Sequence, residues 1–85
     1  MEIVMIFAKK CPQCRSMRQT INSVSNYLGV DITLKEYDCT KEDAIDIALK
    51  YNISDVPGCN INGEIIEGED FSPEDIVNAL KKLGK

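Results

Sequence analysis

A change of hydrophobic period near residue 8 constrains the fold more than any other feature of this sequence. Residues 2–7 (EIVMIF) form an apolar, β-prone run of strand length, which predicts a strand buried on both faces. After a break, the apolar positions step by three and four residues, which predicts an amphipathic helix. They form one stripe: Cys14, Met17, Ile21, Val24 and Leu28. Pro12 suits the first helical position and Gly29 the exit, so the helix should begin directly after Cys11.

Two further elements follow from alternation and from a capping signal. Residues 31–37 (DITLKEY) alternate with period two and predict a strand. Thr40, followed three residues later by Asp43, is similar to a capping box and predicts a helix start. This helix should run to about residue 51, with an apolar face of Ala44, Ile45, Ala48 and Leu49. The strand at residues 2–7, the helix that follows Cys11 and the strand at residues 31–37 form a βαβ unit. Such a unit predicts parallel strands and a right-handed crossover.

The last third of the chain predicts a hairpin and a closing helix. An Asn-Gly pair at residues 62–63, the strongest short hairpin signal, lies between the β-prone residues 59–61 and 64–67. Ser72 precedes a proline and two acidic residues, which is typical of a helix start. The inward face expected for this helix is Ile76, Val77, Leu80 and Leu83. The order βαβαββα predicts an α/β fold whose central four-stranded mixed sheet is flanked by helices.

Length and charge exclude several classes of protein. The 85 residues should form one domain, 1–85, because a second core would leave each half too small to be stable. No apolar run approaches the ~20 residues of a membrane span, and the first residues lack the basic region of a signal peptide. The net charge of −4 argues against nucleic acid as a partner. We therefore expect a cytoplasmic protein, by default a monomer, without a membrane partner.

The cysteine spacing favours a redox pair. Four cysteines in a short chain could build a disulfide framework, but that requires an extracellular context, which nothing here indicates. A structural zinc site normally draws on two close pairs, whereas Cys39 and Cys59 lie twenty residues apart and the chain has no histidine. Cys11 and Cys14 are the one close pair, and we expect no resident metal. The simpler alternative, that they only fill space, is less consistent with their place between a strand and a helix.

The predicted helix gives the two thiols different roles. A free cysteine with a pKa of ~8.5 is mostly protonated at neutral pH, but unpaired N–H groups at a helix N-terminus favour the thiolate. Lys9, Lys10 and Arg15 add positive charge near Cys11. Cys14 belongs to the inward stripe and should be less exposed. We therefore expect Cys11 to attack a substrate disulfide and Cys14 to resolve the mixed disulfide.

At this point the chain resembles the thioredoxin-fold redoxins, over nearly all of its length. Residues 7–14 (FAKKCPQC) look like the passage from strand to active site, with the Cys-Pro-x-Cys form of glutaredoxins. Residues 51–57 (YNISDVP) are similar to the approach to the family's cis-proline. The resemblance implies a thioredoxin fold and a cis Val56–Pro57 bond, whose backbone pairs with an extended substrate segment. It implies that these residues surround the catalytic cysteines: Lys10, Pro12, Gln13, Val56 and Pro57. Asp55 and Gly58 are then expected to contact substrate.

Departures from the family bear on mechanism and substrate. Met5 stands where thioredoxins carry a buried aspartate that moves a proton at the second cysteine. Either water or another acid such as Asp55 serves instead, or the resolving step is slow. The chain has no tryptophan before the motif. Gln13, Asp55 and the acidic residues 67–70 differ from the glutathione-holding residues of glutaredoxins, and the acids would repel that tripeptide. We therefore expect a protein-disulfide reductase, fed by an upstream reductase and without a cofactor.

Three other functions stay open on the sequence. The chain could be a glutathione-dependent glutaredoxin, a metal or iron–sulfur module that shares the cysteine pair between two chains, or a non-catalytic interaction domain. Cys59 follows Pro57 by two residues, so both should lie on one side of a strand. We expect Cys59 to be a buried small hydrophobe rather than a regulatory thiol. Cys39 should lie in a loop, where an exposed but incidental thiol is expected.

Overall fold

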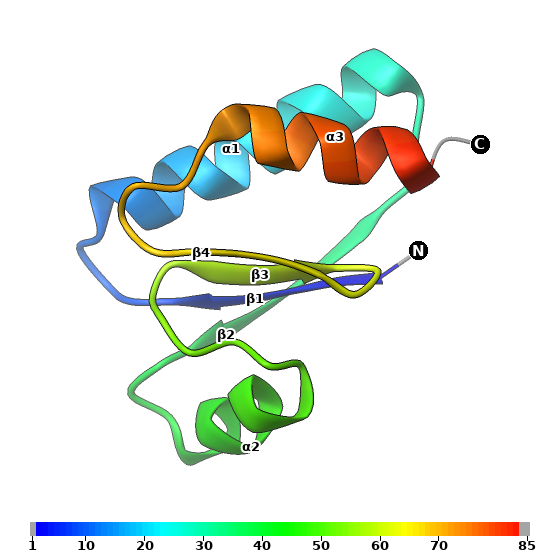
Figure 1. The fold of residues 1–85 in the computed structure, drawn as a ribbon. Helices are drawn as coiled ribbons and strands as arrows, with labels where there is room; N and C mark the ends of the chain where they lie inside the picture. Colours follow the sequence, from blue (N-terminus) through cyan, green and yellow to red (C-terminus); the bar gives the residue numbers. More distant parts are fainter. Residues whose placement is uncertain (1, 84–85) are drawn as a thin grey trace.

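Strand β1 (Glu2–Phe7) lies in the interior of the sheet, as its unbroken apolar run requires. In the computed structural model, which describes residues 2–83, four consecutive side chains of β1 are buried: Ile3, Val4, Met5 and Ile6. Strand β2 (Thr33–Asp38) pairs with β1 in parallel, and β3 (Gly58–Ile61) pairs with its other edge in antiparallel orientation. Because helices cover both faces of the sheet (Figure 1), β1 has no solvent side and needs no polar alternation.

The hairpin predicted at residues 62–63 is confirmed. Strand β4 (Glu64–Glu67) pairs antiparallel with β3, which completes the sheet in the order β2-β1-β3-β4. Asn62 has φ 52° and Gly63 has φ 93°, the positive values that a two-residue type I′ turn requires at both positions. The predicted order βαβαββα and the mixed four-stranded sheet are therefore observed.

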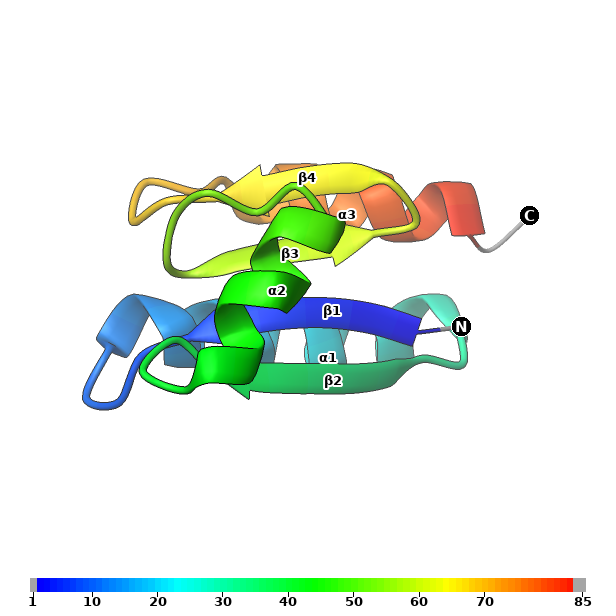
Figure 2. The same ribbon diagram turned by 90° about the horizontal axis from the view of Figure 1, so that it is seen from below.

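The three helices form two layers, one on each face of the sheet. Helices α1 (Pro12–Leu28) and α3 (Pro73–Leu83) pack on one face, and α2 (Glu42–Lys50) lies alone on the other (Figures 1 and 2). The stripe predicted for α1 points into the core, where Cys14, Met17 and Ile21 are buried. Gly29 ends α1 in the left-handed conformation, φ 70°, and its N–H donates to the Asn26 carbonyl at 3.2 Å.

Helix α2 differs from its prediction in both its start and its face. Lys41 is the N-cap and makes no side-chain cap, while the Thr40 N–H and hydroxyl donate to Asp38 Oδ1 at 2.9 and 2.8 Å. These hydrogen bonds lower the pKa of Asp38. The predicted apolar face was wrong for Ile45 and Leu49, whose side chains are 62% and 74% exposed.

The sheet meets α2 through a neighbouring face of the helix. Ala44 is buried, and Ile47 and Ala48 pack with it against Val4 and Ile6 of β1. Positions three and four residues apart share a helix face, whereas Ile45 is turned about 100° from Ala44. Packing against β1 therefore selected the face with Ala44, Ile47 and Ala48 over the larger apolar side chains of Ile45 and Leu49.

Two smaller differences concern β2 and α3. The second strand runs from Thr33 to Asp38 rather than over residues 31–37, a shift that keeps its pairing along the whole of β1. In α3, Ala79 is buried with Ile76 and Leu80, while Val77 is only half-buried. The side chain of Leu83 lies outside the described part. Within residues 2–83, no helix is both long and apolar enough to cross a membrane.

Candidate active site

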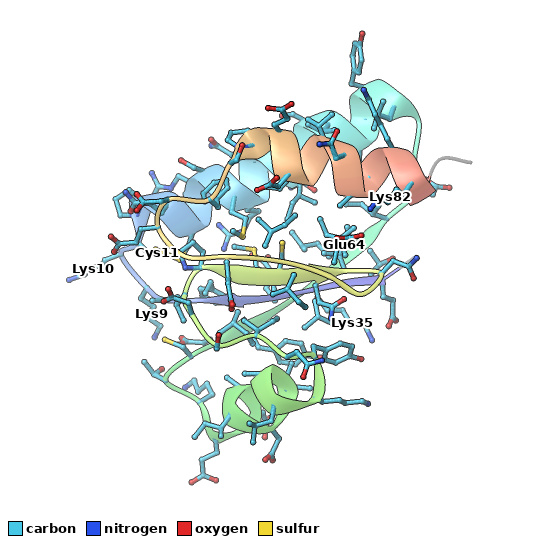
Figure 3. The ribbon with its side chains drawn as sticks, in the orientation of Figure 1. Lys9, Lys10, Cys11, Lys35, Glu64 and Lys82 are labelled. Atoms are coloured by element: carbon cyan, nitrogen blue, oxygen red, sulfur yellow. A yellow bond between two sulfur atoms is a disulfide. The ribbon has the colours of Figure 1, made fainter. Side chains whose placement is uncertain are left out.

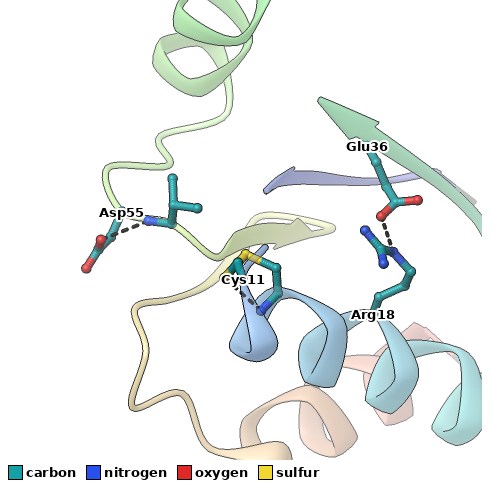
Figure 4. Close-up of a disulfide and its surroundings, with 6 residues drawn as sticks. Cys11, Arg18, Glu36 and Asp55 are labelled. Atoms are coloured by element: carbon teal, nitrogen blue, oxygen red, sulfur yellow. Dashed lines mark hydrogen bonds and ion pairs between the residues drawn. A yellow bond between two sulfur atoms is a disulfide. The ribbon is translucent and has the colours of Figure 1, made fainter. Parts of the chain in front are cut away.

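Cys11 is the N-cap of α1, and Cys14 lies one turn into the helix. Cys11 has extended backbone angles, φ −112° and ψ 106°, and Pro12 opens the helix behind it. The Cys14 N–H donates to Cys11 Sγ at 3.1 Å. The two residues are joined by a disulfide, with their Cα atoms 5.2 Å apart (Figure 4). Because Cys14 is 2% exposed and Cys11 is only half-buried, the predicted difference in exposure between the two sulfurs is confirmed.

The turn from β1 into α1 presents this disulfide at one end of the molecule. Lys10 has a positive φ of 57°, which reverses the chain just before the motif. Figure 3 shows Lys9 and Lys10 on this turn, next to Cys11. Pro12 and Gln13 are exposed in the first turn of the helix. The structure thus brings together the residues predicted on the N-terminal side of the site.

The Val56–Pro57 segment lies beside the disulfide, as predicted. Its peptide bond is cis, which confirms the expectation taken from the family resemblance. Val56 packs against the same hydrophobic cluster as Cys11 and Cys14. Pro57 is fully buried, and its carbonyl accepts a hydrogen bond from Gly68 N–H at 2.8 Å. Gly58, a predicted substrate contact, is buried under this loop rather than open to a ligand.

Asp55 does not reach Cys14. Its side chain is exposed, and Oδ1 accepts a hydrogen bond from the neighbouring Val56 N–H at 2.8 Å. Figure 4 shows the carboxylate pointing away from the disulfide. The acid suggested to replace the aspartate lost at Met5 is therefore not placed to move a proton at Cys14.

Asp55→Asn should leave the resolving step unchanged, because the amide keeps the hydrogen bond to Val56 and no proton transfer is lost. The rate at which Cys14 releases substrate from a preformed mixed disulfide, followed by stopped-flow fluorescence of a labelled peptide, should match wild type within about twofold. A rate at least tenfold slower would contradict this geometry and return Asp55 to the proton path.

Glu67, which the sequence analysis considered only as an acid that would repel glutathione, has a structural role at the site that was not predicted. From the end of β4, its carboxylate accepts hydrogen bonds from the Ser54 N–H at 2.7 Å, the Asp55 N–H at 3.1 Å and the Ser54 hydroxyl at 3.0 Å. It thereby holds the loop that leads into Val56. The partners lie 12 and 13 residues away along the chain, so no local motif could reveal them. One signal could have indicated this role: Glu67 is an acidic residue at the end of β4, and β4 pairs with β3, the strand that follows Pro57.

Glu67→Ala should lower the free energy of unfolding by about 1–2 kcal/mol, since charge-assisted hydrogen bonds are lost from an exposed loop. It should also raise the KM for a protein disulfide, because the Val56 segment becomes less ordered. Glu64→Ala on the same strand removes only a surface ion pair with Lys82 and serves as the control (Figure 3). If the two variants behaved alike in urea unfolding and in KM, Glu67 would have no special role.

Met5 and Cys59 form the apolar floor of the site. They face each other across β1 and β3, both are fully buried, and both belong to the cluster that contains Cys14. Burial raises the pKa of the Cys59 thiol from 9.0 to about 12. The expected burial of Cys59 as a small hydrophobe is therefore confirmed.

The buried Cys59 thiol makes stability depend on alkaline pH. Between pH 9 and 12 the folded protein keeps this proton while the unfolded chain loses it. The free energy of unfolding should fall by about 1.4 kcal/mol per pH unit in this window through this group alone. Urea unfolding of the reduced protein at pH 8.5 and 10 should show a steeper loss for wild type than for Cys59→Ala. Cys39→Ala should keep the wild-type slope, and equal slopes for wild type and Cys59→Ala would contradict the prediction.

Cys39 lies on the other side of the sheet from the disulfide. Its N–H donates to the Phe7 carbonyl at 2.8 Å, which continues the pairing of β2 with β1. The side chain is half-buried against the cluster under α2, so the predicted exposure was too high. Within residues 2–83, no three Cys, Asp or Glu side chains gather where one metal ion could bind them.

A helix N-cap cysteine bonded to a buried cysteine one turn later, beside a cis-proline loop, defines a thiol–disulfide oxidoreductase. The chain belongs to the thioredoxin-domain family, whose family model matches residues 1–81. A search of curated proteins finds no match to the chain.

Solved structures show the same fold. Thioredoxin O2 of Arabidopsis thaliana, in its oxidised state, is 22% identical with a TM-score of 0.74, covering 99% of this chain and 75% of that one. An uncharacterised thioredoxin-like protein of Clostridium perfringens is 24% identical with a TM-score of 0.72, covering 98% and 70%. Thioredoxin 1 of Thermosipho africanus is 20% identical with a TM-score of 0.63, covering 96% and 92%. At these identities the likeness shows the thioredoxin fold.

Proposed function

We propose that this protein reduces disulfides in other proteins, with Cys11 as the nucleophile and Cys14 as the resolving thiol. The observation that carries the proposal is the asymmetry of the pair. The Cys11 sulfur is the more exposed one and lies at the positive end of a 17-residue helix, where the Cys14 N–H points at it. These groups would stabilise a thiolate on Cys11 in the reduced protein. Cys14 is 2% exposed, so an external disulfide would reach it much less readily than Cys11.

The reaction runs in two balanced exchanges. In the first, the Cys11 thiolate attacks one sulfur of a substrate disulfide, a new S–S bond forms, and the other substrate sulfur leaves as a thiolate. In the second, the Cys14 thiol loses its proton to solvent and attacks the Cys11 sulfur. The second substrate sulfur then leaves as a thiolate, and the Cys11–Cys14 disulfide remains. Two electrons have passed to the substrate, so an upstream reductase must return two electrons before the next cycle.

Protein substrates suit the site better than glutathione. The exposed acidic residues of the loop after β4, Glu69 and Asp70, add to the charge of Asp55, which would repel a tripeptide of net negative charge. The Val56 N–H already donates to Asp55, so the Val56 carbonyl is the backbone group that would accept a hydrogen bond from an extended segment of a larger partner. Free thiols at Cys39 and Cys59 suit a reducing compartment, and we place the activity in the cytoplasm with the protein acting as a monomer.

A redox titration tests the proposal. The protein would be equilibrated in thiol–disulfide buffers, alkylated, and its free thiols at Cys11 and Cys14 counted by mass spectrometry. We expect both thiols to disappear together, reversibly, with a midpoint between about −300 and −200 mV. Thiols that stay free at every potential, or that are protected only by a bound metal, would refute the proposal.

A further inference from the structure

A basic cavity opens directly beside the disulfide. It has a volume of about 180 Å³ and lies between the turn after β1 and the first two turns of α1. Its lining comprises the two cysteines, four basic side chains and two apolar residues: Cys11, Cys14, Lys9, Lys10, Arg15, Arg18, Phe7 and Ala8. Carboxylates are absent from this lining. A ligand in the cavity would lie beside the disulfide, where the segment around a substrate cysteine has to come during exchange.

The positive charge of the cavity is only partly neutralised. Lys9 is 4.0 Å from Asp38, and Arg18 pairs with Glu36 while its guanidinium lies over the Phe7 ring, 5.6 Å from the centroid. Within residues 2–83, neither Lys10 nor Arg15 lies within 4 Å of a carboxylate.

In Figure 4, Asp55 lies on the other side of the disulfide from Arg18. The cavity wall therefore keeps two unmatched cations, Lys10 and Arg15, beside the reacting sulfurs.

The exchange reaction removes a negative charge from the neighbourhood of these cations. Before attack, a thiolate on Cys11 would lie at the same cavity wall as these cations. Once Cys11 has attacked, its charge has passed to the departing substrate thiolate, and the mixed disulfide at Cys11 is neutral. A carboxylate on the bound substrate would then supply the missing negative charge.

We propose that this cavity binds Asp or Glu side chains of the substrate protein next to its target cysteine, so that the enzyme prefers disulfides in acidic segments. This inference rests on the proposed function, since it names the substrate class of the same site. The preference comes from Lys10 and Arg15, because the other two cations already have partners.

Three disulfide-linked peptides of equal length, with Asp, Asn or Lys on both sides of the cysteine, test the proposal. The reduced protein is mixed with an excess of each peptide, and the second-order rate constant of the exchange is measured at low and high salt. We expect the Asp peptide to react about tenfold faster than the Lys peptide at low salt, and the ratio to shrink with added salt. The ratio is the readout because a general change in Cys11 reactivity affects all peptides alike.

Two double variants with the same change of net charge separate the cavity from general electrostatics. Lys10→Glu/Arg15→Glu should reverse the preference, whereas Lys50→Glu/Lys81→Glu, in the last turns of α2 and α3, should keep it. A wild-type ratio near one, or the same ratio in both double variants, would overturn the inference. Faster reduction of glutathione disulfide than of the Asp peptide would also overturn it, by assigning the carboxylate to the tripeptide. Failure to reduce any peptide would instead refute the proposed function.

Discussion

Cys14→Ser is expected to convert the protein into a trap that stays covalently bound to its substrate through Cys11. The half-buried Cys11 sulfur, the more accessible of the two, can still attack a substrate disulfide, but no thiol remains to break the mixed disulfide. Cys11→Ser should instead reduce activity to the uncatalysed background, because Cys14 is 2% exposed and an external disulfide cannot reach it. Non-reducing electrophoresis and mass spectrometry after mixing with a disulfide-bearing protein would distinguish the two variants.

Two controls make this result specific. Cys39→Ser removes a thiol on the other side of the sheet and should leave both activity and trapping unchanged. Cys11→Ser/Cys14→Ser should form no adduct, which would show that Cys59 does not substitute for the pair. If Cys11→Ser accumulated the mixed disulfide while Cys14→Ser did not, the assigned roles would be reversed.

Gly58→Ala should be among the most destabilising single changes in this chain. A Cβ built on Gly58 would lie 2.5 Å from the Asp55 carbonyl oxygen and even closer to the Ile53 side chain, which is itself buried. Real Cβ atoms essentially never approach other atoms this closely, so the loop before Val56 must move. We expect a loss of about 3 kcal/mol in urea unfolding and a fall in melting temperature of about 10–20 °C. Reduction of protein disulfides should fall as well, because the displaced loop lies beside the disulfide.

Gly29→Ala provides the matched control. Nothing lies within 4 Å of a Cβ at Gly29, but its φ of 70° is unfavourable for alanine. The expected loss is about 1 kcal/mol, from backbone conformation alone, and the disulfide at the other end of α1 should react normally. If Gly58→Ala were no more destabilising than Gly29→Ala, the close packing around Gly58 would be refuted.

Local signals predicted most of the fold. The apolar run of β1, the stripe of α1 and the Asn-Gly turn each depend on neighbouring residues, and each appears where it was expected. The buried face of α2 was not where it was expected. Ile45 and Leu49 are large apolar residues and were predicted to be buried, but the sheet packs against the face that contains Ala44. Thr40 likewise had a local alternative partner, Asp38, which competed with its role as a cap.

Some features of the candidate site could likewise be predicted from neighbouring residues, and others could not. Cys11 and Cys14 share one helical turn, so their proximity and unequal exposure follow from the spacing alone. The cis Val56–Pro57 bond was expected only from the family resemblance, since an isolated X–Pro bond is usually trans. On the sequence, Asp55 was a candidate for the acid that moves a proton at Cys14. The direction of an exposed side chain, however, depends on the loop around it.

The sequence by itself determined the order of elements, the redox pair at the start of α1 and the burial of β1, since each follows from contacts within a few residues. Only the tertiary structure decided that Glu67 holds the loop before Val56, that Gly58 has no room for a side chain, and that Lys10 and Arg15 line a cavity with the sulfurs. These features join segments from different parts of the chain. Their distances depend on how helices and strands pack, and hydrophobic period does not specify that arrangement.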